Sequence, residues 1–479
     1  MENLKTTLEI LFSMNRRLLG GGYDNALEFI NNLIGLEMVE IPSGTQFGTW
    51  TVPEEWVVKE AWVKYKDKKI IDYDKERLSL VDYSLPFKGM VTREELSRHL
   101  HYSDELPDAT PYVFKFYDRN WGFCIPKNQV KIREVEGCED CEPELKAFDP
   151  EVGKIQIQGD KPKETIKDRL KEGEYEVLID TEFRPGKMKL GIHTITGKKD
   201  REILLFAHLD HPFQANDNLS GVVCLLGLAT KLKTDHTIKI IFCPETIGSQ
   251  AYAYTQDLSK VDFVIAVDIC GNDNTILLQK AWDLEHRVNR VAHCAFQIMA
   301  KPYRKARFRN TIGSDETVFN DPQIGIPGLM FSTWPYKEYH TNWDTPDKIN
   351  YEKIEEMSNL LIKIIEIWER DYIPKRNFNG PLMRSRYGLQ SISKQINLNF
   401  DYFFYSIDGK RSLAELCCDF ELNFDTMYET LKKIEDDGQL MRIDTGQGPI
   451  KPSAKQKYPG FSRQADVSGK RGKVSKHIK

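Results

Sequence analysis

The amino-acid sequence predicts an α/β protein whose main domain has a mostly parallel sheet between two layers of helices. Between residues 187 and 375, four short apolar segments read as strands: LGIHTI, EILLFAH, IKIIFCP and FVIAVDI. Strands this uniformly apolar are typically covered on both faces, as in parallel sheets. Helical segments separate them, and the region ends in a long periodic helix, YEKIEEMSNLLIKIIEIWER. This alternation of strand and helix is the pattern of a layered α/β domain.

The N-terminal residues are expected to belong to this main domain. Apolar residues recur at helical spacing from 5 to 38, and the glycines at 20–22 divide the segment into two helices. Two strand-like stretches follow, GTQFGTWTV and WVVKEAWVKY, which are rich in β-branched and aromatic residues. We therefore assign residues 1–67 to the N-terminal part of the main domain.

Residues 68–178 differ in composition from the flanking segments and are predicted to form a small inserted α+β or β-rich domain. Pro, Tyr and charged residues are frequent here, around the short strands PYVFKFYD, GFCIP and EYEVLID and one helical piece, REELSRHLHY. Cys138 and Cys141 form a CxxC, but no second ligand pair lies at a suitable spacing. A loop with two thiols is therefore expected in preference to a zinc knuckle.

After the main domain, 179–375, the chain is predicted to form a winged-helix-like domain at 376–450. Ser412 and Glu415 form a capping box at the start of SLAELCCDF. A second helix, FDTMYETLKKIEDDG, and a strand, QLMRID, follow. Residues 451–479 carry nine Lys/Arg against one Asp and are expected to be a disordered basic tail.

Composition narrows the class of protein. No apolar run approaches the roughly 20 residues of a membrane span, and the N-terminus lacks a signal-peptide pattern. The nine cysteines are scattered and mostly sit in apolar runs, which suits a reducing compartment. We expect a cytoplasmic protein that does not contact membranes. The net charge of −5, with a more acidic body than tail, disfavours nucleic acid as the main ligand.

The chemistry is expected where the apolar strands end. His208 and Glu245 follow two of these strands, and Asp268 closes a third. Ligands bind at the carboxyl ends of strands in open α/β sheets, so these side chains should converge. Asp210 is close enough to hold the second nitrogen of His208. Asp217 precedes an apolar helix, where it could cap the helix or bridge two metals.

One more histidine completes the predicted site. His340 follows another strand, in an aromatic loop, WPYKEYHTNWDTPDKI. Two histidines and three carboxylates predict a metal site, and this nitrogen and oxygen ligand set favours zinc. The predicted ligands are His208, Asp217, Glu245, Asp268 and His340.

These motifs resemble the zinc aminopeptidases that use two metals. The matching segments are His208-Leu-Asp210, Asn216-Asp217-Asn218-Leu-Ser220-Gly221, Glu245 before Gly248-Ser249, Asp268, Ser314-Asp315, Tyr339-His340-Thr341 and Asp344-Thr345-Pro346-Asp347. The layout also resembles a bacterial aminopeptidase-like subgroup that has an inserted domain and a winged helix and occurs beside polysaccharide-biosynthesis genes. The resemblance implies a three-layer zinc-peptidase-like main domain.

It also implies roles for the residues. His208, Asp217 and Asp268 would hold one zinc; His340, Asp217 and a glutamate would hold a second; a neighbouring glutamate would be the general base. Here the sequence departs from the family, because two adjacent glutamates are replaced by Glu245-Thr246. If Glu245 is the base, the second metal keeps only His340 and the shared Asp217. If it is a ligand, Glu316 and Glu338 are loose candidates for the base.

The expected function is amide-bond hydrolysis with one or two zinc ions, most simply an aminopeptidase acting on small peptides or aminoacyl compounds. One alternative is an amidase or deacylase of an N-acylated sugar or cell-wall precursor. Another is a non-catalytic metal-binding regulator. The second helix of the winged-helix-like module carries Lys432 and Lys433 against five acidic residues, so this module is expected to contact protein, or a second copy of the chain, in preference to DNA. Arg304, Arg307 and Arg309 could meet an anionic substrate group, although a solvated basic turn explains them too.

Overall fold

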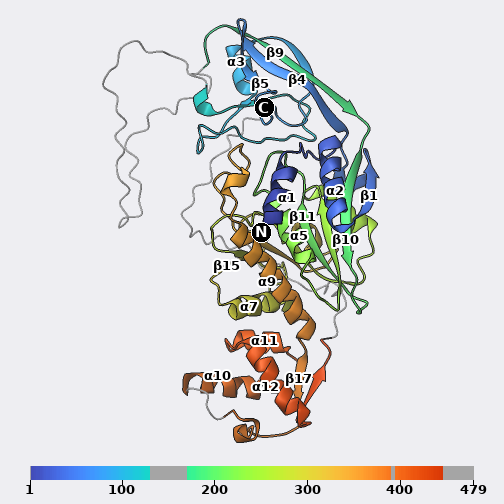
Figure 1. Ribbon diagram of the computed structural model, residues 1–479, viewed down its shortest axis with the longest axis vertical. Helices are drawn as coiled ribbons and strands as arrows, with labels where there is room; N and C mark the ends of the chain where they lie inside the picture. Colours follow the sequence, from blue (N-terminus) through green and yellow to red (C-terminus); the bar gives the residue numbers. More distant parts are fainter. Residues whose placement is uncertain (1, 130–169, 390–393, 446–479) are drawn as a thin grey trace, which may run out of the picture.

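The structure is a computed structural model, and it describes residues 2–129, 170–389 and 394–445. Three parts follow one another along the long axis of the molecule (Figure 1): a small sheet at one end, an α/β body in the middle and a helical module at the other end. Cys138, Cys141 and the basic tail at 451–479 lie outside the described residues. Among the helices that are described, none combines the length and apolarity needed to cross a bilayer.

An eight-stranded sheet forms the centre of the body, in the order β1-β10-β12-β11-β13-β16-β14-β15. Its four middle strands run parallel, and antiparallel pairs flank them on both sides. The strands are β1 (Glu37–Pro42), β10 (Lys187–Ile195), β11 (Glu202–His208), β12 (Thr237–Cys243), β13 (Val261–Val267), β14 (Leu277–Gln279), β15 (Arg304–Ala306) and β16 (Gly328–Ser332). The predicted α/β class with a mostly parallel central sheet is confirmed.

Both faces of this sheet are buried, and the alternation of side chains along β11 shows it. Ile203 and Leu205 belong to one hydrophobic cluster, while Leu204 and Phe206 belong to the other. The first cluster includes side chains of α1 (Glu2–Phe12), α2 (Gly21–Ile34), α5 (Leu219–Ala229), α7 (Arg287–Met299) and α9 (Tyr351–Arg370). The second includes side chains of α6 (Ile247–Thr255) and α8 (Glu316–Phe319). The body therefore has three layers.

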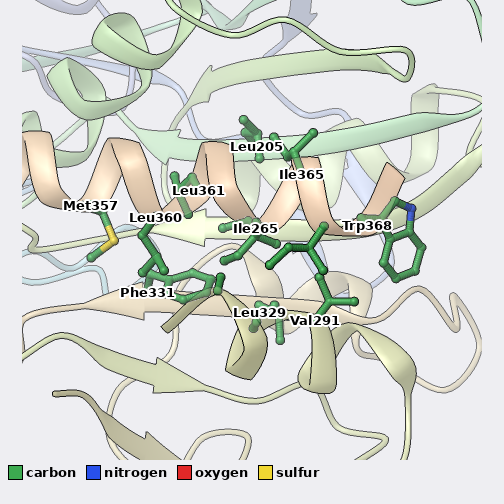
Figure 2. Close-up of a cluster of buried hydrophobic side chains, with 14 of the residues drawn as sticks. Leu205, Ile265, Val291, Leu329, Phe331, Met357, Leu360, Leu361, Ile365 and Trp368 are labelled. Carbon is green, nitrogen blue, oxygen red and sulfur yellow. The ribbon is translucent and has the colours of Figure 1, made fainter. Parts of the chain in front are cut away.

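The long helix α9 anchors one helical layer. Its Leu361 and Ile365 are fully buried and lie over the sheet beside Leu205 and Ile265 (Figure 2). The side chains repeat at helical spacing, so one stripe of the helix faces the core. Each such side chain contributes about 1.5–3 kcal/mol of burial free energy. This packing holds the strand ends in fixed relative positions.

A second sheet, in the order β5-β4-β9-β6, forms the small end of the molecule. Its strands are β4 (Glu55–Tyr65), β5 (Lys68–Asp72), β6 (Phe87–Thr92) and β9 (Glu174–Arg184), and α3 (Arg93–Arg98) follows β6. β4 lies before the predicted boundary at 68, and β9 crosses the one at 178; the domain boundaries stay a prediction. Shorter elements are β2 (Gln46–Phe47), β3 (Trp50–Thr51), β7 (Leu100–His101), β8 (Phe123–Cys124), η1 (Lys127–Gln129) and η2 (Pro346–Lys348).

The C-terminal module contains the predicted helix pair and strand. Its elements are β17 (Ile373–Arg376), η3 (Arg384–Tyr387), α10 (Lys394–Tyr405), α11 (Leu413–Asp419), α12 (Phe424–Asp436) and β18 (Leu440–Ile443). The capping box of Ser412 and Glu415 begins α11, and β17 pairs with β18. A buried ion pair between Arg287 and Asp371 lies where α9 ends, and Asp371 also accepts a hydrogen bond from the backbone N–H of Ala414. The assignment as a winged helix stays a prediction.

Candidate metal centre

Three parallel strands bring their terminal side chains together at one edge of the sheet. His208 is the last residue of β11, Glu245 follows β12 by two positions, and Asp268 comes directly after β13. These three side chains each offer one ligand atom, and the three atoms lie within 4.8 Å of one another. The distance from His208 Nε2 to Asp268 Oδ1 is 3.9 Å. The strand-end residues thus meet as the sequence pattern predicts.

Asp217 occupies the centre of the cluster, with three imidazoles around it. Its Oδ1 lies 3.0 Å from His208 Nε2 and 3.3 Å from His211 Nδ1. Its Oδ2 lies 3.0 Å from Nε2 of His340. Asp217 does not cap the helix that follows, because Asn218 is the N-cap of α5 and accepts from the N–H of Gly221. Both of its carboxylate oxygens therefore face the cluster.

A buried carboxylate fixes the backbone that carries Asp217. Asp344 is fully buried, and its carboxylate accepts hydrogen bonds from the backbone N–H groups of Asn216, at 2.7 Å, and Asp217, at 3.0 Å. The hydroxyl of Tyr336 donates to the same carboxylate at 3.1 Å. Asp344 thus holds the central residue in position without facing the cluster itself.

The role expected for Asp210 differs in the structure. Its Oδ1 accepts a hydrogen bond from the backbone N–H of Glu245 at 2.9 Å, and among the described residues it makes no hydrogen bond to His208. The second nitrogen of His208, Nδ1, faces Ser314 Oγ at 3.4 Å and Asp315 Oδ2 at 4.0 Å. Asp210 comes from the loop after the strand, which turns its carboxylate towards the next strand end. It positions the backbone of Glu245 instead of the imidazole.

The charge balance of the cluster favours a bound cation. Burial alone would lower the pKa of His208, but Asp268, Glu245 and Asp217 together raise it well above its usual value. Burial raises the pKa of Glu245 to about 8 and that of Asp268 to about 7. Buried carboxylates retain protons in this way when too little positive charge faces them. A divalent cation would supply that charge.

Unpaired polar atoms identify where such a cation fits. Within the described part of the chain, several buried polar atoms of this cluster have close neighbours but no hydrogen-bond partner of good geometry, and buried polar groups are normally paired. They are His211 Nδ1, Asp217 Oδ2, Asp268 Oδ1, Asp315 Oδ2 and His340 Nε2. Nitrogen and carboxylate oxygen donors are the ligands that zinc takes in proteins. The donor set therefore fits a zinc site.

The cluster reaches solvent through two of its side chains. The side chains of Glu245 and His340 are 24% and 20% exposed, whereas those of His208 and Asp217 are almost completely buried. Aromatic rings border this opening: Tyr339 stacks on His340, with ring centroids 3.8 Å apart. Tyr112, from the segment between β7 and β8, donates its backbone N–H to the carbonyl oxygen of His340 at 2.7 Å.

The looser candidates for the general base have partners of their own. Glu316 is fully buried and accepts from the backbone N–H of Ser314 and the side chain of Gln279. Glu338 forms an ion pair with Lys348 at 3.0 Å. Glu245 is the glutamate that lies in the cluster and is also partly open to solvent.

Sequence reasoning did not select His211. It belongs to the same HLDH segment as His208, it is 3% exposed, and it lies beside both Asp217 and Glu245. A second histidine three residues after a strand-end histidine was the available signal. Arg304, by contrast, donates to the backbone carbonyl groups of Thr275 and Trp334.

Comparisons with known proteins agree with this architecture. A family model described as a domain of unknown function, DUF4910, matches residues 5–371. A Clostridium acetobutylicum protein is 29% identical over 428 residues, covering 85% of this chain and 89% of its own. Its provisional name joins polysaccharide biosynthesis with an aminopeptidase-like domain.

Solved structures share the fold. A provisionally named peptidase from Clostridium acetobutylicum has a TM-score of 0.73 at 24% identity, covering 92% of this chain and 96% of its own. BSAP, a zinc aminopeptidase from Bacillus subtilis, has a TM-score of 0.53 at 13% identity, covering 76% and 94%. An M28 peptidase precursor from Shewanella amazonensis has a TM-score of 0.51 at 14% identity, covering 77% and 93%. The resemblance to aminopeptidases noted from the motifs is thereby confirmed at the level of the fold.

Proposed function

We propose that this chain, which belongs to the DUF4910 family, is a zinc-dependent hydrolase that cleaves an amide bond. The observation that carries the proposal is the set of unpaired, buried nitrogen and carboxylate atoms around Asp217, at the edge where three parallel strands end. The names of the solved structures with this fold, a zinc aminopeptidase and an M28 peptidase among them, support the same reaction class.

The residues for one zinc ion are His208, Asp217 and Asp268. Oδ2 of Asp217 and Nε2 of His340, which lie 3.0 Å apart, offer two donors for a second ion. When bound, zinc supplies an acidified water and polarises the carbonyl group of the substrate. Asp344 and Asp210 hold the backbone of Asp217 and Glu245, so these side chains stay aligned before substrate arrives.

Glu245 is proposed as the general base. It lies beside the proposed ligands, and its side chain is 24% exposed, so it can reach both the attacking water and the leaving nitrogen. It takes the proton of the attacking water as the new C–O bond forms. It then gives that proton to the leaving nitrogen as the C–N bond breaks. The products are a carboxylic acid and a free amine.

The favoured substrate is a small peptide or aminoacyl compound with a free amino group, as in an aminopeptidase. The aromatic rings of Tyr339 and Tyr112 beside the opening favour a small substrate over a folded chain. A second candidate rests on the name of the Clostridium relative, which mentions polysaccharide biosynthesis. It is a deacylase that removes an N-acyl group from a sugar or cell-wall precursor.

We also propose that the module at 376–450 contacts protein, or a second copy of the chain, and not DNA. Two acidic residues of α12 are engaged in ion pairs, Asp425 with Arg370 and Glu435 with Arg442. The exposed face keeps Glu429 beside Lys432 and Lys433, so it lacks the excess of basic residues that phosphate contacts require.

One experiment separates these proposals. Purified protein is loaded with zinc and assayed against aminoacyl-arylamides, small dipeptides and N-acetylated amino sugars. Hydrolysis that Glu245→Gln abolishes and Glu338→Gln preserves supports an amide hydrolase, and the responding substrate class distinguishes aminopeptidase from deacylase. Zinc binding without hydrolysis of any of the three classes would count against the enzyme and favour a metal-binding regulator. Failure to bind zinc would contradict the proposal altogether.

A further inference from the structure

We infer that His211 is a metal ligand, sharing an ion with Asp217 through its Nδ1 atom. The inference rests on the proposed zinc site and adds a third imidazole to it. His211 follows the His208-Leu-Asp210 motif directly and is not one of the residues that the motif pattern singles out. Its place in the cluster comes from the geometry of the loop between β11 and α5.

The distances suit a shared ion. Two ligands on one tetrahedral zinc, each bonded at about 2.0–2.1 Å, lie about 3.3–3.4 Å apart. Nδ1 of His211 lies 3.3 Å from Asp217 Oδ1, and the nitrogen of His208 that faces the same oxygen is at 3.0 Å. Ligand atoms of these three residues all fall within 4.8 Å of one another.

Because the His211 side chain is buried, packing fixes the direction in which its ring nitrogens point. The residue is 3% exposed, and among the described residues its Nδ1 has no hydrogen-bond partner of good geometry. Buried polar atoms are normally paired, so a nitrogen without a well-aligned partner indicates that a ligand would contact it. Nδ1 of His211 faces the same carboxylate oxygen of Asp217 as Nε2 of His208 does, which is the arrangement expected of two nitrogen ligands on one ion.

The backbone is held in the conformation that aims this ring. His211 has φ 72°, in the left-handed region that few residues other than glycine adopt. Arg16, fully buried, donates from its guanidinium to the carbonyl oxygens of Leu209 at 2.7 Å, Asp210 at 3.2 Å and Gln214 at 3.0 Å. Arg16 thus fixes the loop backbone both before and after His211.

A third imidazole also gives the cluster a donor that does not come from Glu245. The neighbouring residue, Thr246, offers no carboxylate, so Glu245 would otherwise have to serve as both ligand and base. With His211 among the ligands, the cluster reaches three imidazoles and two aspartates without Glu245. Nε2 of His211 lies 3.7 Å from Glu245 Oε2, close enough to orient that carboxylate.

The test compares two nearly isosteric variants, His211→Asn and His211→Asp. Both place a polar atom where Nδ1 stood, but only the aspartate supplies an anionic ligand. Zinc affinity is measured by chelator competition, and the ligands are counted by zinc X-ray absorption. His193→Asn is the matched control, since His193 is a half-buried histidine on β10 that lies outside the cluster.

We expect His211→Asn to weaken at least one bound zinc by more than about 100-fold, since loss of an outer-shell partner costs about 10–100-fold. The absorption spectrum should lose one imidazole, and His211→Asp should bind within about tenfold of the wild type. Zinc affinity in His211→Asn that falls by less than about 100-fold, with an unchanged imidazole count, would overturn the assignment. A wild-type protein that binds no zinc would instead refute the proposed function, so the two failures are distinguishable.

Discussion

Removing the carboxylate of Asp344 should destabilise the metal site without touching a metal ligand. Asp344→Ala leaves the buried N–H groups of Asn216 and Asp217 without their acceptors. Each unpaired buried donor costs about 1–3 kcal/mol, so the pair costs about 2–6 kcal/mol. In a domain of this size 1 kcal/mol lowers Tm by about 2–4 °C, and Tm should therefore fall by at least about 4 °C.

Zinc affinity should fall as well, by about 10–100-fold, because Asp217 is no longer held in place. Asp344→Asn keeps one acceptor oxygen and should lie between the wild type and the alanine variant in both Tm and zinc affinity. The control is Asp347→Ala, an exposed carboxylate three residues along the same segment. Thermal scans with and without zinc, together with chelator competition, measure both effects. If Asp344→Ala matched Asp347→Ala in Tm and in affinity, the positioning role would be refuted.

Four further predictions follow from the same contacts. Glu245→Gln should lower kcat by about 10²–10⁴-fold while retaining zinc, and unchanged hydrolysis would remove Glu245 from the base role. Burial raises the pKa of Asp268 to about 7 and that of Glu245 to about 8. Between about pH 4 and pH 8 the folded metal-free protein therefore holds protons that the unfolded chain has released, so its free energy of unfolding should fall as the pH rises. The increase in Tm on adding zinc should grow over the same range, because the ligands must lose their protons to bind the ion. An increase in Tm that does not depend on pH would contradict this. Arg16→Leu should weaken zinc binding by about 10–100-fold, measured by chelator competition, and Arg16→Lys should not restore it because an ammonium group cannot reach the same spread of carbonyl oxygens. Asp371→Ala breaks the buried pair with Arg287 and should cost about 3–5 kcal/mol, seen as a lower Tm, with zinc affinity unchanged.

The strand-end residues were predictable because local pattern and topology agree there. Three strands of seven mostly apolar residues, β11, β12 and β13, are recognisable in the sequence, and parallel neighbours end at one edge of the sheet. The grouping of His208, Glu245 and Asp268 therefore follows from the sequence pattern alone. The capping box of Ser412 was equally local, since its hydrogen bonds join residues three positions apart.

Other features depend on contacts that no local pattern contains. The ring of His211 is aimed by a left-handed backbone and by Arg16, which lies almost 200 residues earlier in the chain. The expected partner of Asp210 was its neighbour in sequence, whereas its actual partner is the backbone of Glu245 on the next strand. The strand at Glu55–Tyr65 was predictable from its residues, but its pairing with Glu174–Arg184 was not.

The most direct test of the zinc centre is an anomalous difference map at the zinc edge, from crystals of the zinc-loaded protein. We expect a peak at about 2.0–2.2 Å from both His208 Nε2 and a carboxylate oxygen of Asp217. Crystals of Asp217→Ala should lose that peak. Zinc bound elsewhere, or a peak at this edge of the sheet that survives in Asp217→Ala, would contradict a zinc centre built around Asp217.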